Sequence, residues 1–285
     1  MNDLIGEVAG LLISAGSPSP GPEARQLVAH VLGVELSQLI RIDGVTAEDR
    51  EEILRLAARR AAGEPLQHIT GRAYFRYESL EVGPGVFIPR PETEEMVGWL
   101  LTTLAQRPAT SRRVVELCAG SGAITAALAR EIGGVELHAV ELSPDAFAYL
   151  ERNLDHVAVD LRLGDMAEAF RDLDGTVDAV IANPPYIPTS HRAFLPDDVV
   201  AHDPELALFS GDDGLDATRT VAQVARRLLV PGGVLASEHD DSHPDAAMEV
   251  LTQAGFVDVA SHDDLTSRPR YVTGVQPSTS GRMDA

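Results

Sequence analysis

The stretch Val177–Tyr186 reads Val-Asp-Ala-Val-Ile-Ala-Asn-Pro-Pro-Tyr, and it decides the fold class of the chain. Its first six residues form a nearly continuous apolar run, which is typical of a parallel strand buried on both faces. Asn183 and two prolines follow at once, so the run ends there. Open α/β sheets carry their chemistry at the carboxyl ends of such strands. The stretch therefore predicts an α/β sheet with a functional loop at its edge.

The loop after this run is suited to accepting hydrogen bonds. Pro184 and Pro185 fix two φ angles and remove two backbone donors, so the loop is stiff and its acceptors lack local partners. A planar NH2 group fits it, with one hydrogen on the Asn183 side-chain oxygen, the other on the Pro184 carbonyl oxygen, and the Tyr186 ring on its flat face. The motif resembles that of methyltransferases that use S-adenosylmethionine to alkylate amide or exocyclic amino nitrogens. A plain proline-rich turn is the alternative.

From residue 113 onward, the pattern alternates between strands and helices. Strands are expected at 114–117, 135–140, 157–161, 177–182, 234–238, 256–261 and 270–275, and helices at 122–131, 144–154, 215–229 and 244–254. This order predicts a doubly wound sheet with helices on both faces.

The chain before that point has a different pattern. Residues 1–72 show apolar positions at helical spacing and predict a small helical domain whose default role is substrate recognition, with Thr46 and Asp49 as a capping box. Residues 73–86 predict a β-hairpin linker, and 87–275 form the α/β domain. The polar residues 276–285 are expected to be a disordered tail.

Composition excludes several classes of protein. The 285 residues carry a formal net charge of −21 with a pI near 4.7, which argues against a broad basic face for nucleic acid. The single cysteine, Cys118, permits no internal disulfide and suits a reducing cytoplasm. No stretch approaches the roughly 20 apolar residues of a membrane helix. We expect a cytoplasmic protein, a monomer, with neither a membrane nor a nucleic-acid partner.

The first strand-to-helix turn predicts the cofactor site. It reads Glu116-Leu117-Cys118-Ala119-Gly120-Ser121-Gly122, where glycines let a ligand approach the backbone and the helix N-terminus offers free N–H groups. Glu141 ends the second strand and suits two ribose hydroxyls. Asp165 follows the third strand as a candidate for the adenine amino group, with Met166 on the ring face. An exposed strand-end acid and a plain Gly-Asp turn are the respective alternatives.

Taken together, these motifs resemble the PrmC/HemK family, which methylates the glutamine amide nitrogen of peptide chain release factors. The stretches that carry the resemblance are Pro65–Gly71, Phe87–Glu94, Gly120–Gly122, Asn183–Ile187, Gly211–Leu215 and Pro231–Gly233. The segment Ile-Pro-Arg-Pro-Glu-Thr-Glu within Phe87–Glu94 discriminates best, because generic Asn-Pro-Pro-Tyr enzymes lack it.

The resemblance implies both a reaction and its participants. The cofactor is S-adenosyl-L-methionine, the product S-adenosyl-L-homocysteine, and the substrate the Gly-Gly-Gln glutamine of class I release factors, methylated at N5 to support translation termination. Asn183, Pro184 and Tyr186 would be catalytic, and Asn183 would also border the cofactor. Pro89, Arg90 and Pro185 would join Asn183, Pro184 and Tyr186 in binding substrate. The implied fold is a helical domain, a hairpin and a seven-stranded catalytic domain.

The sequence departs from the family pattern at two places. The glycine loop of the family usually reads Asp-Leu-Gly-Thr-Gly, whereas here it reads Glu116-Leu117-Cys118-Ala119-Gly120. Cys118 and Ala119 are small enough for a close approach, and Cys118 is expected to require a non-glycine backbone angle. Glu238-His239-Asp240-Asp241, with His243 and Asp245, replaces the usual Glu-x-Gly pattern. Because these residues lack regular ligand spacing, we expect a solvated loop and no metal.

Two other functions remain open at this point. An adenine-N6 or cytosine-N4 nucleic-acid methyltransferase can use the same loop, although the acidic composition disfavours it. A non-catalytic protein that keeps the fold and docks a partner is the second alternative. The intact Asn183–Tyr186 loop and Glu141 favour catalysis.

Overall fold

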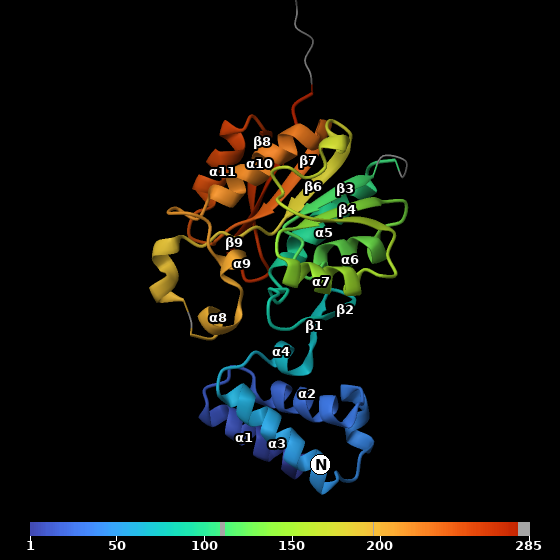
Figure 1. Cartoon of the computed structure of the whole chain (residues 1–285), viewed down its shortest axis with the longest axis vertical. Coiled ribbons are helices and arrows are strands. Elements are labelled where there is room, and N and C mark those ends of the chain that lie inside the picture. The colour runs from blue at the N-terminus through green and yellow to red at the C-terminus, as the bar shows by residue number, and fades with distance from the viewer. Residues whose placement is uncertain (109–111, 196, 279–285) are drawn as a thin grey trace, which may run out of the picture. The chain divides into compact units, whose positions relative to one another are not determined.

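A computed structural model describes residues 1–108, 112–195 and 197–278 of the chain (Figure 1). These residues form two compact units. The smaller contains Met1–Arg72 together with residues 197–202, and the larger contains Ala73–Leu195 and the chain from Asp203 onward.

The smaller unit is helical, as predicted. Its elements are α1 (Asn2–Ser14), α2 (Pro20–Leu32), η1 (Leu36–Arg41), α3 (Ala47–Ala61), α4 (Leu66–Thr70) and α8 (Asp197–His202). The apolar faces of α1, α2 and α3 bury a common core that includes Val8, Leu27 and Ile53. The Thr46 hydroxyl accepts a hydrogen bond from the Asp49 backbone at 3.0 Å, so the predicted N-terminal cap of α3 is present.

A short hairpin opens the larger unit. Strands β1 (Arg72–Phe75) and β2 (Glu78–Glu81) pair with each other, as the sequence predicts. Phe75 and Leu80 are buried in the same apolar cluster as the first helices of the larger unit. The hairpin is therefore packed into that unit's core.

The centre of the larger unit is a seven-stranded sheet. Its spatial order is β5-β4-β3-β6-β7-β9-β8, with the first five strands parallel and β9 antiparallel to both neighbours. The strands are β3 (Arg113–Leu117), β4 (Glu136–Glu141), β5 (Val159–Leu163), β6 (Val177–Ala182), β7 (Leu229–Glu238), β8 (Val257–Asp263) and β9 (Pro269–Val275). The doubly wound fold is confirmed.

Helices cover both faces of this sheet (Figure 1). Helices α5 (Thr93–Ala105), α6 (Ala123–Glu131) and α7 (Pro144–Asn153) pack on one face, and α10 (Asp216–Leu228) and α11 (Pro244–Gln253) on the other. In β6, Ala179 and Ile181 enter the first core while Val180 and Ala182 enter the second. Burial on both faces explains why the strand is a continuous apolar run.

The sheet order reverses direction between β3 and β6, and this point positions the site. Leu117, the last residue of β3, pairs with Ala182, the last residue of β6, and Ala182 pairs on its other side with Ser237 of β7. Cys118, Asn183 and Glu238 are the next residues along these three segments, so they lie side by side at this edge of the sheet. This crevice is where doubly wound sheets bind ligands.

Some boundaries differ from the sequence prediction. Strand β7 begins at Leu229, five residues before the expected position, because Leu229 pairs with Val177 and a register shift accommodates Pro231–Gly233. The stretch between residues 186 and 215, for which the sequence predicts no strand or helix, contains η3 (Thr189–Phe194), α8 and α9 (Glu205–Leu208). A short helix, η2 (Arg171–Leu173), precedes β6.

The expected C-terminal tail begins with a residue that is hydrogen-bonded to β7. Gln276, the first residue of the expected tail, exchanges backbone hydrogen bonds with Gly232 and Gly233, and residues 279–285 of that tail lie outside the described residues. Among the residues described, no helix is long and apolar enough to cross a membrane.

Candidate active site

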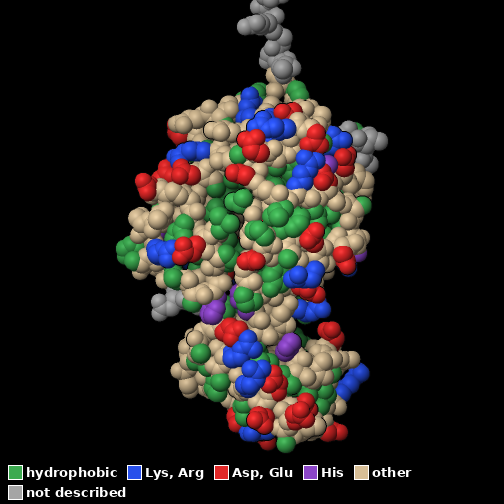
Figure 2. All heavy atoms as spheres, viewed as in Figure 1, with side chains coloured by type: hydrophobic (Ala, Val, Ile, Leu, Met, Phe, Trp, Pro, Cys, Tyr) green, Lys and Arg blue, Asp and Glu red, His purple; other side chains and the backbone are tan. Residues whose placement is uncertain are grey.

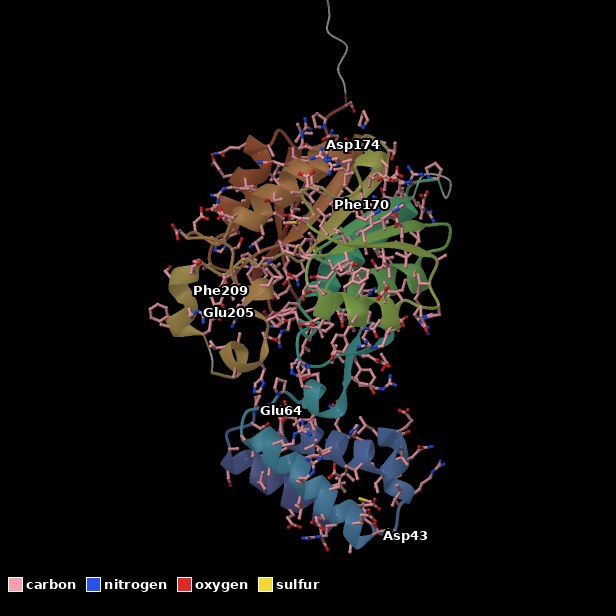
Figure 3. The ribbon with its side chains drawn as sticks, viewed as in Figure 1. Asp43, Glu64, Phe170, Asp174, Glu205 and Phe209 are labelled. Atoms are coloured by element: carbon pink, nitrogen blue, oxygen red, sulfur yellow. The ribbon has the colours of Figure 1, made fainter. Side chains whose placement is uncertain are left out.

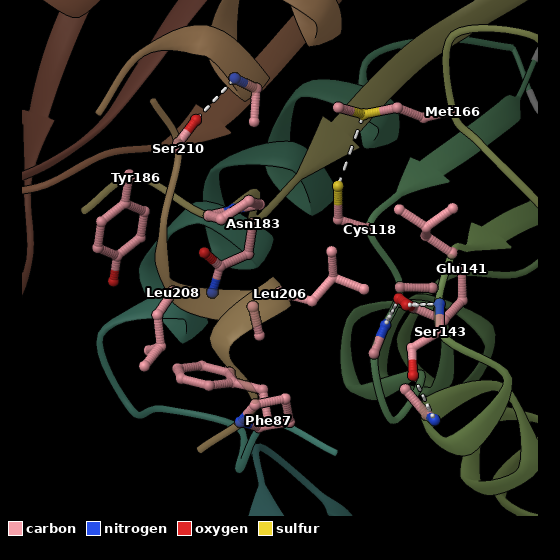
Figure 4. Close-up of a pocket in the computed structure, with 18 of the residues that line it drawn as sticks. Phe87, Cys118, Glu141, Ser143, Met166, Asn183, Tyr186, Leu206, Leu208 and Ser210 are labelled. Atoms are coloured by element: carbon pink, nitrogen blue, oxygen red, sulfur yellow. Dashed lines mark hydrogen bonds between the residues drawn. The ribbon is translucent and has the colours of Figure 1, made fainter. Parts of the chain in front are cut away.

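A cavity of about 490 Å³ lies at the reversal point of the sheet (Figure 4). Most predicted site residues line it: Pro89, Arg90, Glu116, Cys118, Ala119, Gly120, Ser121, Glu141, Asp165, Met166, Asn183, Pro185 and Tyr186. Gly122 and Pro184 do not. Because residues from five separate segments converge there, the cavity is the candidate active site.

The glycine loop turns sharply after β3. Cys118 has a φ of 59°, Gly120 of 56° and Gly122 of 84°, so three residues are left-handed. The expectation that Cys118 would need an ordinary backbone angle is therefore wrong: the turn imposes the left-handed conformation on a side chain that rarely adopts it. A side chain at Gly120 would meet no atom within 4 Å, so its backbone faces open space.

Gly122 serves packing instead of lining the cavity. A Cβ atom there would lie 2.7 Å from a Leu150 methyl group of α7. Gly122 is also the N-cap of α6. It therefore allows α6 and α7 to approach each other.

The Glu141 carboxylate is fixed by backbone donors on both of its oxygens (Figure 4). The Gly120 N–H donates to one oxygen at 2.8 Å, and the Ser143 N–H to the other at 2.7 Å. Each carboxylate oxygen can accept a second hydrogen bond. Glu141 is thus held rigidly with two acceptors left over, spaced as two neighbouring hydroxyls of a sugar require.

Glu116 is a second carboxyl group at the base of the loop. It is buried, and one of its oxygens accepts from the backbone N–H of Thr125 at 2.9 Å and from the Thr125 hydroxyl. Burial raises its pKa to about 8; the hydrogen bonds from Thr125 oppose this, and the charge of Glu141 adds to it. Glu116 therefore takes up a proton far more readily than a surface glutamate.

Sulfur atoms form the far wall of the cavity. The Cys118 thiol lies 3.6 Å from the Met166 sulfur (Figure 4). Burial, reinforced by the charge of Glu141, raises the pKa of the Cys118 thiol well above its usual range. Asp165 beside them is exposed and accepts the Ala167 N–H at 2.9 Å.

Asn183 points its carboxamide into the cavity (Figure 4). Its Nδ2 donates to the Thr93 hydroxyl at 3.2 Å, and that hydroxyl donates to Glu238 Oε2 at 2.6 Å. Tyr186 donates its own hydroxyl to the other oxygen of Glu238 at 3.2 Å. The Asn-Pro-Pro-Tyr loop is therefore anchored at both ends to one carboxyl group.

The expectation of a solvated loop at Glu238–Asp245 is wrong for its first two residues. Glu238 is the last residue of β7, only 1% exposed, and His239 is fully buried. Asp241 and Asp245 are exposed, as expected. Register explains the difference, because a strand pairing with β6 must bring its end to the Asn183 loop. Within the described residues, no group of three or more His, Cys, Asp or Glu side chains is placed to hold a metal ion.

The segment 203–217 forms another wall of the cavity. Its backbone is hydrogen-bonded to Ile187, the residue after the Asn-Pro-Pro-Tyr loop. The Ile187 N–H donates to the Leu208 carbonyl oxygen and the Ser210 N–H donates to the Ile187 carbonyl oxygen, both at 2.9 Å. A Cβ atom at Gly214 would lie 2.4 Å from the Tyr186 carbonyl oxygen. The Gly-Asp-Asp-Gly-Leu motif therefore serves to hold the Asn-Pro-Pro-Tyr loop.

A surface arginine secures the outer side of this wall. Arg192 pairs with Glu205 and lies over the Phe209 ring, 5.0 Å from its centroid; Figure 3 shows these two partners beside each other. Glu205 and Phe209 both belong to the wall at 203–217. The short α9 is thereby tied to η3.

Arg90 lies at the mouth of the cavity. Its guanidinium pairs with the buried Asp203 at 2.8 Å and stacks on Phe87, 4.9 Å from the ring centroid. Its side chain is nevertheless 38% exposed. The predicted substrate residue Arg90 thus also joins the segment before α5 to the wall at 203–217.

The lining fits a nucleoside with an extended tail. Glu141 offers acceptors for ribose hydroxyls, Gly120 leaves its backbone open, and apolar Leu142, Val140 and Met166 border the space. Volumes of about 300–1,000 Å³ are typical of small-molecule sites.

Comparison with known proteins identifies the family of the chain. The PrmC N-terminal domain family matches residues 3–71, and the methyltransferase small domain family matches residues 82–202. A release factor glutamine methyltransferase of Streptomyces coelicolor is 48% identical, with 96% of this chain and 98% of the relative aligned. The chain belongs to the family of release factor glutamine methyltransferases. A further member, from Mycolicibacterium smegmatis, is 41% identical over 93% of this chain and 94% of its own.

A relative with a different named activity also aligns with most of the chain. A 4-amino-L-phenylalanine/4-methylamino-L-phenylalanine methyltransferase of Streptomyces pristinaespiralis is 38% identical, covering 87% of this chain and 85% of that one. Among solved structures, the catalytic domain of hMettl16 in complex with the MAT2A 3'UTR hairpin 6 aligns with a TM-score of 0.57 at 14% identity, covering 78% of this chain and 81% of the other. That likeness supports the fold alone.

Sequence reasoning missed Thr93 and Glu238. In the sequence, Thr93 is one residue of the Ile-Pro-Arg-Pro-Glu-Thr-Glu segment and Glu238 one residue of an acidic cluster, and neither pattern points to a role at the site. The signal that identifies Glu238 is topological, because a polar residue at the end of β7 must neighbour the end of β6. No strand pairing identifies Thr93, which is the first residue of α5.

Proposed function

We propose that the protein methylates the side-chain amide nitrogen of the Gly-Gly-Gln glutamine in class I peptide release factors, with S-adenosyl-L-methionine as methyl donor. The observation that carries this proposal is the Asn183 carboxamide in the cavity, fixed by Thr93 and facing the glycine loop across adjacent strand ends. Family membership supports the substrate.

Residues of the glycine-loop side would hold the cofactor. Glu141 would accept the ribose hydroxyls, Met166 would lie on the adenine with Asp165 at its amino group, and the backbone of Gly120 would face the methionine part. When bound, S-adenosyl-L-methionine supplies an electrophilic methyl group, and S-adenosyl-L-homocysteine remains after transfer.

Residues of the Asn-Pro-Pro-Tyr side would hold the glutamine. An amide nitrogen is a poor nucleophile, because its lone pair is delocalised into the carbonyl group. The Asn183 oxygen and the Pro184 carbonyl oxygen would accept its two hydrogens, so the nitrogen is aimed at the methyl group and its developing positive charge is stabilised. Tyr186 would fix the plane of the amide. Proton loss then follows transfer, because an alkylated amide nitrogen is strongly acidic.

We further propose that the smaller helical unit recognises the folded substrate. All candidates for nucleoside contacts lie in the larger unit, and the smaller one exposes large apolar side chains at Leu36 and Ile40 of η1, 50% and 91% exposed. Ile40→Ser should raise the KM for a folded release factor without changing that for a short Gly-Gly-Gln peptide. Equal KM values for the factor in both proteins would contradict this role.

The relative with an arylamine substrate defines the main competing function. A free 4-aminophenylalanine also presents a planar nitrogen with two hydrogens, so the Asn183 loop alone does not distinguish the two substrates. Nucleic acid is disfavoured, because acidic and basic side chains are interspersed on the larger unit's visible face, without a continuous basic region there (Figure 2).

A comparison of four candidate substrates tests the proposal. Formation of S-adenosyl-L-homocysteine is measured with an unmodified release factor, the same factor with its motif glutamine replaced by asparagine, free 4-aminophenylalanine, and duplex DNA. We expect product with the unmodified factor alone. Product with the amino acid or DNA, and none with the factor, would overturn the proposal.

A further inference from the structure

Glu238 lies behind the wall that carries Asn183, and Thr93 lies between the two side chains. The mechanism above uses Thr93 only as an anchor for Asn183 and gives Glu238 no role. Glu238 does not line the cavity, while Thr93 does. Both are buried, with exposed fractions of 1% and 3%. They come from β7 and the first residue of α5, so their meeting is a product of the fold.

Hydrogen-bond chemistry determines which group donates and which accepts in this network. An ionised carboxylate only accepts hydrogen bonds, and the two oxygens of Glu238 each face a hydroxyl, from Thr93 and from Tyr186. Thr93 has a single hydroxyl proton, which it donates to Glu238. Its oxygen can then only accept, so the group that Asn183 turns toward it must be the NH2.

This direction determines which atom of the Asn183 carboxamide faces the cavity. With its NH2 committed to Thr93 at 3.2 Å, Asn183 presents its carbonyl oxygen to the remaining space. This orientation of the carboxamide follows from the hydrogen-bond network itself. An acceptor there matches a substrate nitrogen that carries two hydrogens, and it repels a carboxylate oxygen.

We propose that Glu238 and Thr93 are positioning residues that set the Asn183 carboxamide with its oxygen toward the substrate, and thereby select an amide over a carboxylate. Through Tyr186, the same carboxylate fixes the other side of the amide site. This inference rests on the proposed function, since it names how that function's substrate nitrogen is held.

Protonation of Glu238 should undo the arrangement. Burial raises its pKa to about 7, against the opposing effects of the Thr93 hydrogen bond and the Arg270 charge. Tyr186 also donates to it, and Glu92 of the α5 entry raises the pKa further. Once protonated, Glu238 can donate to Thr93, which frees the Thr93 proton for Asn183 and lets the carboxamide rotate.

Four variants of the full-length protein test the inference, with kcat and cofactor affinity measured on each. Thr93→Val removes the hydroxyl at nearly constant shape, and Thr93→Ser restores it. Glu238→Gln imitates the protonated acid. Thr103→Val is the matched control, because the Thr103 hydroxyl on the same helix α5 bonds only the carbonyl oxygen of Trp99 at 2.9 Å.

We expect Thr93→Val and Glu238→Gln to lower kcat by about 10- to 100-fold, by analogy with the loss found when a residue that orients a metal ligand is removed. Cofactor affinity should stay unchanged, Thr93→Ser should recover most of the activity, and Thr103→Val should match the wild type. The wild-type kcat should fall as the pH is lowered through about 7, whereas Glu238→Gln should be low and flat over that range.

A double-mutant cycle distinguishes positioning from general damage. If Thr93 acts through Asn183, adding Thr93→Val to Asn183→Ala should change kcat little, because the group to be positioned is gone. Fully additive losses, or a folded Thr93→Val protein with wild-type kcat, would overturn the inference. A wild-type enzyme inactive on the release factor would instead count against the proposed function.

Discussion

Glu141→Ala should weaken cofactor binding by roughly 1.5 to 3 kcal/mol, the contribution of hydrogen bonds to a charged group. This corresponds to a dissociation constant about 10- to 160-fold higher. The structure sets the reasoning: each Glu141 oxygen already accepts one backbone N–H, from Gly120 or Ser143, and has one acceptor position left for a ribose hydroxyl. Calorimetric titration with S-adenosyl-L-methionine measures the change.

Two further variants sharpen this test. Glu141→Gln should bind as poorly as Glu141→Ala, because its NH2 group must face the N–H of Gly120 or Ser143. Glu136→Ala is the matched control, since it removes the same charge from the exposed start of the same strand β4. Wild-type affinity in Glu141→Ala, or an equal loss in Glu136→Ala, would refute the ribose assignment. Melting without cofactor reports any loosening of the glycine loop.

Four other predictions follow from the site. Asn183→Ala should lower kcat by about 100- to 1000-fold with little change in cofactor affinity, as removal of one preorganised hydrogen-bonding group does; wild-type single-turnover rates in a folded variant would show that Asn183 only caps the turn. Glu116 has its pKa raised to about 8 in the folded state, so the stability that its protonated form provides is complete below the ordinary value of 4.5 and is lost as the pH rises to about 8. The free energy of unfolding of Glu116→Gln, measured by melting at each pH, should therefore exceed that of the wild type by a margin that grows from acidic to alkaline pH, on the order of a few kcal/mol. A margin that stays constant with pH would contradict the burial argument. Cys118 should alkylate slowly at neutral pH, because its thiol pKa is raised, and more slowly still with cofactor bound; mass spectrometry after iodoacetamide treatment measures this, and rapid, cofactor-independent labelling would place the thiol outside the site. Gly214→Ala should lower both the melting temperature and kcat, since its φ is +79° and a Cβ would lie 2.4 Å from the Tyr186 carbonyl oxygen; unaltered values would mean that the loop relaxes freely.

The fold was predictable because its signals are local. An apolar run buried on both faces, as in Val177–Ala182, allows few alternatives to a parallel strand, and glycines at a strand-to-helix turn mark where the chain must bend. The proposed cofactor side of the site shares this property. Glu116, Gly120 and Glu141 each lie at a strand end that the pattern itself identifies.

The substrate side was less predictable because it depends on pairing between distant strands. Glu238 looks like part of an acidic loop until β7 is placed beside β6, and only then does it lie under Asn183 and Tyr186. Cys118 shows the same limit for backbone conformation. Its left-handed φ of 59° follows from the turn between β3 and α6, and side-chain preference alone predicts otherwise.

The most direct test of the central claim is to locate the methyl group. A release factor produced without the modification is incubated with the protein and S-adenosyl-L-methionine, and its peptides are sequenced by tandem mass spectrometry. We predict one added methyl group, confined to the side chain of the glutamine in the Gly-Gly-Gln motif and lacking when Asn183→Ala is used for the same short time. A methyl group on any other residue, or an unmodified glutamine after full cofactor turnover, would contradict the account.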